Sequence, residues 1–290
     1  MAGVPAAPAL LLALAIAATA PSPARASGDA GLTLGYDIHV GGLKLGRMTL
    51  ETRVEGDHYR VAVGARAADL LDRLVRWSYT AEAAGRFTPD GGVAPDRFSS
   101  DRTLRDRRWT ARLDYDAAGL PTHTHVPPQS AEDEAAVPPD QRPGTVDLLS
   151  ASAAIARAAE AKGGVCAARV PVYDGRRRYD VVASPVGDRA IAAGRYGVFS
   201  GTAIGCRIEI HPVAGFRQAR RNETDFWTVD PSGRPRGFDL WLGRPAPGDP
   251  LVPVRMEARE LFYTRVIGHL ATIDRPAPRD RAADQRAERR

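Results

Sequence analysis

From Leu32 onward, apolar and polar residues alternate with a period of two. Over residues 32–40 one face of an extended chain carries the apolar side chains Leu32, Leu34, Tyr36, Ile38 and Val40. This alternation is typical of a half-buried β-strand. Gly41-Gly42 then predicts a turn, residues 43–54 a returning strand, and residues 58–67 a third strand. The pattern therefore predicts a β-meander.

Further strand-like segments follow, separated in part by residues that favour turns. Turn candidates with Gly, Pro, Asp or Ser occur at residues 89–92, 116–119, 174–175 and 231–233. The strand-like segments are residues 77–87, 108–115, 178–183, 196–210, 218–229, 237–242, 252–262 and 264–273. Many short strands in succession favour sequential antiparallel pairing. The predicted fold is mostly β, a single antiparallel curved sheet or an open β-barrel.

One region departs from this pattern. Residues 126–144 contain five prolines and an acidic cluster, and they predict a long exposed loop. Residues 147–162 carry the helical signature, with Thr145 or Asp147 as the N-cap, an alanine-rich middle and Gly163-Gly164 at the end. We expect this helix to cover or plug the sheet.

Both ends of the chain are expected to lie outside the domain. Residues 7–20 are apolar but too short to span a bilayer, which takes about 20 residues. With the small-residue pattern Ala24-Arg25-Ala26 they predict a signal peptide cleaved after Ala26, hence a periplasmic protein; the alternative is a retained membrane anchor. Residues 27–273 would form the single β-rich domain. The charged residues 274–290 predict a disordered tail.

The basic residues indicate no nucleic-acid partner. The formal net charge is +5, carried almost entirely by arginine, with Lys44 and Lys162 as the lysines. These charges alternate with Asp and Glu through most of the chain, whereas a DNA-binding surface gathers them on one face. Contact with an anionic membrane surface is compatible with the charge.

The two cysteines are expected to form a disulfide. An oxidising compartment favours pairing of Cys166 with Cys206, and no Cys-x-x-Cys motif indicates redox activity. We predict that the two cysteines lie on neighbouring strands and join the second half of the chain to the helix.

No catalytic or metal-binding motif stands out, and no cofactor is implied. His-Glu-x-x-His and Gly-x-Ser-x-Gly motifs are absent. His123 and His125 would share a strand face, but no third metal ligand accompanies them. An enzyme would need a site assembled from distant residues, for example His39 or His211 with Asp225.

Two groups of residues are candidates for binding. Arg176, Arg177 and Arg178 follow an Asp-Gly turn and could bind phosphate or carboxylate, although the favoured explanation is a hairpin turn with a solvated basic strand start. The tryptophans of the strand-like segments could line a cavity for a lipophilic ligand or simply fill the core. They are Trp77, Trp109, Trp227 and Trp241.

Several motifs, taken together, resemble a bacterial envelope family. They are residues 36–38 with Gly41, Gly42 and Gly46, the turn 174–180, residues 200–206 and 212–216, Trp227, and residues 252–255. Their order resembles the domain of unknown function 3108, in its alphaproteobacterial form, over residues 32–273. The resemblance implies an exported β-rich protein and carries over no catalytic residue. More loosely, it suggests the curved-sheet carriers of lipoprotein localisation.

These observations favour a non-enzymatic envelope-maintenance module that binds a lipophilic ligand or an envelope protein. The alternatives are a purely structural or interaction scaffold, and a hydrolase whose site is not visible in the sequence.

Overall fold

The computed structural model describes residues 30–68, 72, 76–125, 137–218, 228–229, 233–258 and 264–275. Its strands are β1 (Ala30–Val40), β2 (Leu43–Glu55), β3 (His58–Ala67), β4 (Trp77–Phe87), β5 (Val93–Leu104), β6 (Arg107–Tyr115), β7 (Pro121–His125), β8 (Ala168–Tyr173), β9 (Arg178–Pro185), β10 (Arg189–Ile191), β11 (Gly201–Ala214), β12 (Arg217–Gln218), β13 (Thr228–Val229), β14 (Arg236–Gly243), β15 (Val252–Ala258) and β16 (Val266–Asp274). The helical elements whose bounds lie within these residues are the 3-10 turn η1 (Pro139–Gln141) and the α-helix α2 (Leu148–Ala161).

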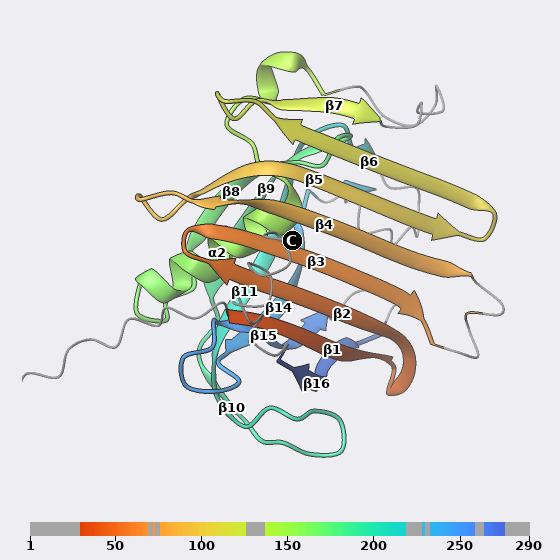
Figure 1. Ribbon diagram of the computed structural model, residues 1–290. Helices are drawn as coiled ribbons and strands as arrows, with labels where there is room; N and C mark the ends of the chain where they lie inside the picture. Colours follow the sequence, from red (N-terminus) through yellow and green to blue (C-terminus); the bar gives the residue numbers. More distant parts are fainter. Residues whose placement is uncertain are drawn as a thin grey trace, which may run out of the picture.

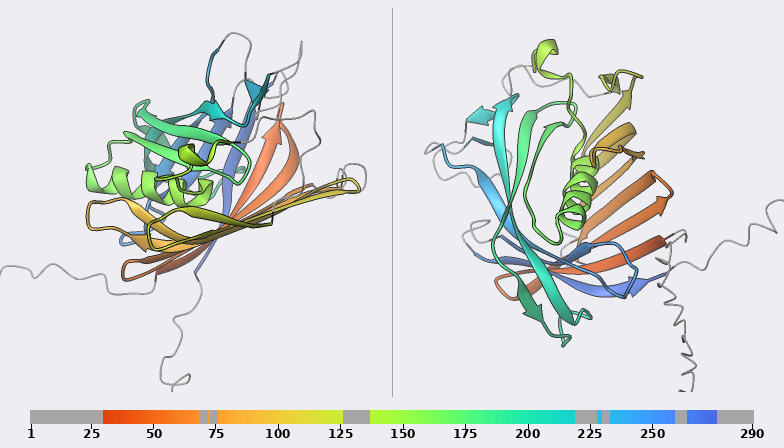
Figure 2. Two further views of the ribbon diagram at one scale, coloured as in Figure 1. Left: turned by 90° about the horizontal axis from the view of Figure 1, so that it is seen from above. Right: turned by 90° about the vertical axis from the view of Figure 1, so that its left-hand side faces the viewer.

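All strands except β12 and β13 belong to one sheet. Its order is β7-β6-β5-β4-β3-β2-β1-β16-β15-β14-β11-β9-β8, with β10 paired to β11. The sheet bends so strongly that its two arms face each other across α2 (Figures 1 and 2). The edge strands β7 and β8 do not pair within the described residues, so the sheet stays open. The predicted single antiparallel curved sheet with one packed helix is confirmed, and no closed barrel forms.

Individual strands differ from the sequence prediction where the apolar pattern is weak. β5 was not among the predicted strands, yet it pairs along its length with β4 and β6. Only Pro95 and Phe98 of this strand are buried, because its other face is polar and open to solvent. The predicted strand 196–210 begins only at Gly201, since residues 192–200 form a loop. Most of the predicted strand 218–229 lies outside the described residues.

The helix α2 occupies the concave side of the sheet. The Asp147 carboxylate caps it by accepting hydrogen bonds from the backbone N–H groups of Leu149 and Ser150, at 3.0 and 2.9 Å. This is the N-cap geometry that satisfies the otherwise unpaired first-turn donors. The predicted helix at 147–162 is confirmed, and Asp147, rather than Thr145, is the cap.

Side chains of α2 fill the space between the two arms. Ile155 belongs to a core cluster with Val181 and other residues of β8, β9, β11 and β14. Leu149 belongs to a second cluster with Phe98 and other residues of β3 to β6. A third cluster lies between β1 and β14 to β16, over which Phe199 folds from the 192–200 loop. The helix therefore takes the place that a ligand would occupy in a hollow carrier.

The disulfide between Cys166 and Cys206 is present, with Cα atoms 5.5 Å apart. Its predicted position on neighbouring strands is wrong in one respect. Cys206 lies on β11, but Cys166 lies in the connection between α2 and β8, because the helix ends at Ala161 and β8 begins only at Ala168. The bond joins the end of α2 to the sheet, as predicted.

The remaining predicted segments are only partly described. The predicted signal peptide, residues 1–26, lies outside the described residues. Of the Pro-rich segment, residues 137–144 are described, and there Val137 is buried in the core. At the other end, Asp274 closes β16 and Arg275 pairs with Asp249 at 2.6 Å. Among the described residues, no helix is long and apolar enough to cross a membrane.

Candidate functional site

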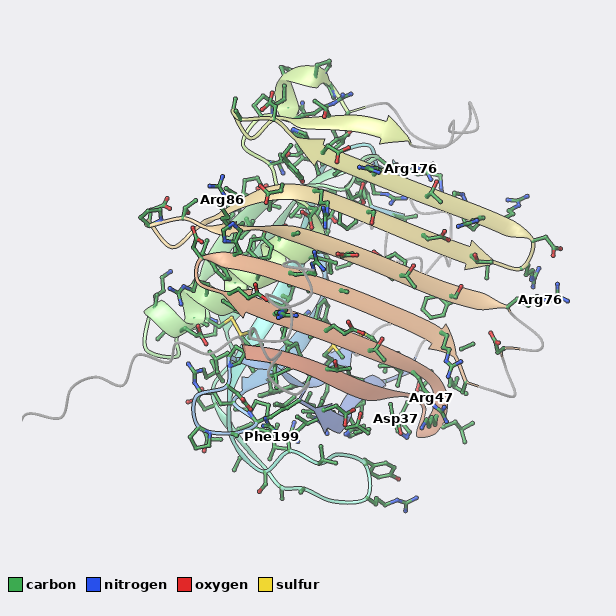
Figure 3. All side chains as sticks on the ribbon, in the orientation of Figure 1. Asp37, Arg47, Arg76, Arg86, Arg176 and Phe199 are labelled. Atoms are coloured by element: carbon green, nitrogen blue, oxygen red, sulfur yellow. A yellow bond between two sulfur atoms is a disulfide. The ribbon has the colours of Figure 1, made fainter. Side chains whose placement is uncertain are left out.

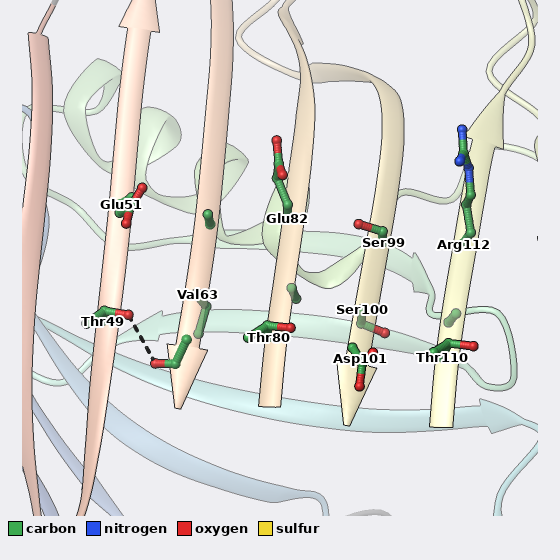
Figure 4. Close-up of a pocket in the computed structure, with 14 residues that line it drawn as sticks. Thr49, Glu51, Val63, Thr80, Glu82, Ser99, Ser100, Asp101, Thr110 and Arg112 are labelled. Carbon is green, nitrogen blue, oxygen red and sulfur yellow. Dashed lines mark hydrogen bonds between the residues drawn. The ribbon is translucent and has the colours of Figure 1, made fainter. Parts of the chain in front are cut away.

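A polar trough crosses the face of the sheet that points away from α2 (Figure 4). It spans β2 to β6, is open to solvent and has a volume of about 590 Å³. Two rows of directly paired residues cross the five strands. They are Thr49, Gly64, Thr80, Asp101 and Thr110, and beside them Glu51, Ala62, Glu82, Ser99 and Arg112.

The trough exists because small residues stand in the middle of long strands. Gly64 has no side chain and Ala62 has only a methyl group, so the surface of the sheet is hollowed at β3. We call this part of the trough its floor. The Thr49 hydroxyl reaches across and donates to the Gly64 carbonyl at 3.4 Å. Side chains alternate between the two faces of a strand, so the same strands bury Val61, Ala83 and Phe98 against α2.

Charges in the trough are largely paired with arginines at its margins. Glu82 pairs with Arg60 at 3.5 Å, and Asp101 pairs with Arg108. Exposed ion pairs of this kind contribute little to stability, typically below about 1 kcal/mol each. The charged groups among the fourteen lining residues are the carboxylates of Glu51, Glu82 and Asp101 and the guanidinium of Arg112.

A second, smaller hollow lies where the 192–200 loop covers β15 and β16. We call it the arginine–histidine pocket. Its volume is about 160 Å³, and its lining is Ile191, Ala192, Gly194, Arg195, Tyr196, Gly197, Phe199, Val254, Arg255, His269 and Leu270. The loop is held in place by a hydrogen bond from the Val198 N–H to the Leu270 carbonyl, at 2.9 Å. Phe199, labelled in Figure 3, is the buried side chain that the loop contributes to this lining.

Three rings form one wall of this region. The Tyr196 ring stacks on His269 with centroids 5.4 Å apart, and the buried His39 ring meets both edge-on, at 5.2 Å from Tyr196 and 5.4 Å from His269. The contact arises because β1 and β16 are neighbours, and the loop brings Tyr196 over both strands.

A shared carboxylate organises the charges beside these rings. Arg255 donates to Glu257 at 2.7 Å and to Nδ1 of His269 at 3.3 Å, and Arg189 also donates to Glu257, at 3.2 Å. Burial and the positive charge of Arg255 lower the pKa of His269, which keeps the ring neutral. Burial alone would raise the pKa of Glu257, but the hydrogen bond and charge of Arg255 outweigh it and lower that pKa.

Sequence reasoning did not single out this pocket. It named His39 as a candidate for a site assembled from residues far apart in the sequence, but it did not select Tyr196, Arg255 or His269. The available signal was the adjacency of the predicted strands 252–262 and 264–273, which places Arg255 opposite His269. The loop residue Tyr196 carried no such signal, because its segment was predicted to be a strand.

The predicted arginine turn is mostly engaged within the protein. Residues 174–177 connect β8 to β9, and the Asp174 carboxylate accepts hydrogen bonds from the backbone N–H groups of Arg176 and Arg177. Arg177 pairs with Asp174 at 3.6 Å, and Arg178 pairs with Asp180 at 2.6 Å. These contacts favour a hairpin turn with structural ion pairs, and the proposed anion binding by these three arginines stays a prediction.

Three of the four predicted tryptophans lie within the described residues, so their shared lining of a cavity stays a prediction. Trp241 is buried in the cluster around β14 to β16, with Arg189 over its ring. Trp109 lies on β6 beneath Arg102, Trp77 opens β4, and Trp227 lies outside the described residues. Trp77, Trp109 and Trp241 do not line either of the two hollows described above.

The other predicted candidates are only partly described. His211 lies on β11 with its ring 3.4 Å from Glu209, on the arm opposite β3 and β4. Asp225, its suggested partner, lies outside the described residues, as do the side chains of His123 and His125. No group of three potential metal ligands occurs within the part of the chain that the structure describes.

The fold and these hollows define the class: a mostly-β protein made of one open, curved antiparallel sheet around a single helix. The chain belongs to the family described as protein of unknown function (DUF3108), whose model matches residues 35–262. The predicted family resemblance is thus confirmed at the level of the family. No curated protein matches the chain.

Proposed function

We propose that the protein is an exported periplasmic module without enzymatic activity, which binds an envelope protein through the polar trough and so serves envelope maintenance. Export is supported by the signal-like residues 1–26. Binding is supported above all by the trough itself, an open hollow of about 590 Å³ on a face that no other described element covers. Its hydroxyl and carboxylate groups suit a polar partner segment with basic or amide donors.

A lipophilic ligand is the second candidate. The concave side of the sheet supports it less well than the trough supports a protein partner. A carrier needs an apolar cavity, and pockets for small ligands are usually about 300–1,000 Å³. Here Leu149, Ile155 and the alanines of α2 occupy the concave side. The filled interior is also compatible with a structural scaffold. A scaffold role differs from our proposal because it requires no specific partner at the trough.

Export can be tested directly with the whole chain. We expect osmotic shock of an expressing bacterium to release a protein that begins at Ser27. Retention of the intact N-terminus in the cytoplasm or in the membrane would contradict export, and the second result would support the retained anchor.

Partner binding can be tested by placing a photo-crosslinking amino acid at Thr80, in the centre of the trough, in living cells. Val213 on β11 is the control, because it is 51% exposed and lies outside the trough. We expect one discrete envelope protein to crosslink at Thr80 and not at Val213. The substitution Ala62→Arg, which fills the low floor, should abolish that product while leaving the melting temperature close to the native value.

The same cells distinguish the alternatives. Stoichiometric lipid in organic extracts of the purified protein, without a crosslink at Thr80, would replace the protein partner with a lipophilic ligand. Identical weak crosslinking at Thr80 and Val213, without bound lipid, would support the scaffold.

A further inference from the structure

The polar side chains that line the arginine–histidine pocket are hydrogen-bond donors, with no carboxylate among them. Arg195, Arg255 and His269 contribute nitrogen donors, and Tyr196 contributes a hydroxyl. The rest of the lining is apolar or glycine. A cavity of this composition repels cations and has no acceptor carboxylate to compete with an anionic occupant.

The hydrogen bond between Arg255 and His269 determines the state of the imidazole. Guanidinium groups only donate, so Nδ1 of His269 must accept, and the single ring proton of the neutral imidazole resides on Nε2. Within the described residues, the hydrogen bonds of Arg255 go to Glu257 and to His269 Nδ1, and that of His269 goes to Arg255. The second terminal nitrogen of Arg255 and the Nε2–H of His269 are therefore left to donate to an occupant.

The surrounding charge also favours an anion. The carboxylate of Glu257 is only 4% exposed and serves two guanidinium groups, those of Arg255 and Arg189. Arg195 adds a third positive charge over the Tyr196 ring. A second carboxylate, Asp37, also acts on His269, but it is itself paired with Lys44 at 2.6 Å. Two carboxylates against three arginines and a lysine leave an excess of positive charge, which a bound anion would neutralise through charge-assisted hydrogen bonds.

We propose that the arginine–histidine pocket binds a small anion, a phosphate or carboxylate group, between Arg255, His269 and Tyr196. Its volume of about 160 Å³ is that of roughly five water molecules. This is below the usual range of organic ligand pockets and suits a single anionic group. The pocket is separate from the trough on β2 to β6. The proposal of anion binding is therefore independent of the proposed partner binding.

The test is a titration of the mature protein with sodium phosphate and, separately, sodium acetate, at constant ionic strength set with chloride. NMR signals of the His269 ring report binding. We expect a saturable shift for at least one of the two anions. Arg255→Gln should weaken the apparent affinity about tenfold or more, as expected when a charged hydrogen bond is lost. Arg207→Gln is the matched control, because Arg207 is also a strand arginine paired with a carboxylate, Asp239, but lies outside the pocket.

A second variant covers the case in which Arg255→Gln fails to fold because it leaves Glu257 with one partner fewer. His269→Gln removes the ring, and its anion binding is then followed as the rise in melting temperature with anion concentration. We expect that rise to be smaller than in the native protein and in Arg207→Gln.

Vesicles of phosphatidylcholine with and without phosphatidylglycerol identify the source of the anionic group. Binding to the anionic vesicles that is lost in Arg255→Gln or His269→Gln assigns the group to a lipid headgroup, whereas binding of soluble anion alone assigns it to a free small molecule. The proposal is overturned if neither anion gives a saturable response and vesicle binding is absent. It is also overturned if the response is the same in the pocket variants as in the native protein.

Discussion

The hydroxyl of Tyr59 on β3 donates a hydrogen bond of 2.7 Å to the Ser150 hydroxyl on α2, although 91 residues separate them. Ser150 in turn donates to the buried Asp147 carboxylate at 2.5 Å. Tyr59, Ser150 and Asp147 are all buried, so this chain of hydrogen bonds ties the cap of the helix to the sheet. Hydrogen bonds in such a network are interdependent, because removing one partner leaves another buried group unsatisfied.

The first prediction concerns this link. Tyr59→Phe should lower the free energy of unfolding by about 1 kcal/mol and Ser150→Ala by about 1–3 kcal/mol, since the latter also deprives Asp147 of a donor. The double variant should lose less than the sum, because both changes disrupt the same contact. Urea unfolding measures all three. The control is Thr80→Ala in the exposed trough, which should change the free energy of unfolding by less than about 0.5 kcal/mol. If the losses from Tyr59→Phe and Ser150→Ala were additive in the double variant, the two hydrogen bonds would be independent of each other.

The second prediction is a pH dependence caused by Asp147. Burial raises the pKa of this carboxyl to about 6, although hydrogen bonds from Ser150 and the backbone N–H groups oppose the shift. In the unfolded chain the group titrates near its ordinary pKa, about 3.9. The folded state therefore holds the proton more tightly, and the stability this provides is present below about pH 4 and is lost as the pH rises through 6.

Asp147→Asn tests this dependence because asparagine keeps a capping oxygen but does not ionise. The stability of the native protein relative to this variant should fall by about 2 kcal/mol between pH 4 and pH 7. Ser152→Ala, an exposed change on the same helix, should give a difference that does not depend on pH. A constant difference between the native protein and Asp147→Asn would contradict the raised pKa.

The third prediction concerns the disulfide. Cys166 and Cys206 are 40 residues apart in sequence, and closing such a loop stabilises the folded state by about 4 kcal/mol in the chain-entropy model. We expect Cys166→Ala/Cys206→Ala to melt at a lower temperature than the native protein. Reductant should lower the native melting temperature towards that of the variant and leave the variant unchanged. Two reactive thiols in the denatured, unreduced protein would exclude the bond.

The fourth prediction uses two glycines that differ in their surroundings. A Cβ added to Gly205 on β11 would overlap the Gly187 carbonyl oxygen, which belongs to the backbone and cannot easily move, whereas one added to Gly194 would meet nothing within 4 Å. Gly205→Ala should therefore destabilise the fold by about 1–3 kcal/mol, as overpacking usually does, and Gly194→Ala should be close to neutral. Thermal unfolding of the two variants makes the comparison. Equal stability would show that the strand can shift away from residue 187.

The fifth prediction concerns His269, whose pKa is lowered by burial and by the adjacent cation Arg255. Arg255→Gln removes that charge, so the pKa of His269 should rise. An NMR titration of the ring protons measures the change. Arg207→Gln should leave the titration of His269 as it is in the native protein. An unchanged pKa in Arg255→Gln would assign the shift to burial and to the neighbouring His39.

Local patterns anticipated much of the architecture because they reflect local physics. The alternation at residues 32–40 requires a strand with one buried face, and Asp147 before an alanine-rich segment requires a capped helix. β5 escaped notice because its face in the trough is polar, so it lacks the apolar alternation from which strands are recognised. The same polar face of β5 forms part of the lining of the trough.

The sequence by itself therefore determined the strand-rich class, the helix at 148–161, the family and, through two cysteines and an export-like N-terminus, the expectation of a disulfide. Only the tertiary structure decided that β1 pairs with β16, which brings His39 beside His269, and that the 192–200 loop adds Tyr196 to them. The physical reason is that strand pairing over some 230 residues depends on how the whole sheet bends around α2. No local pattern of residues encodes that curvature. The positions of the trough and of the arginine–histidine pocket therefore follow only from the tertiary structure.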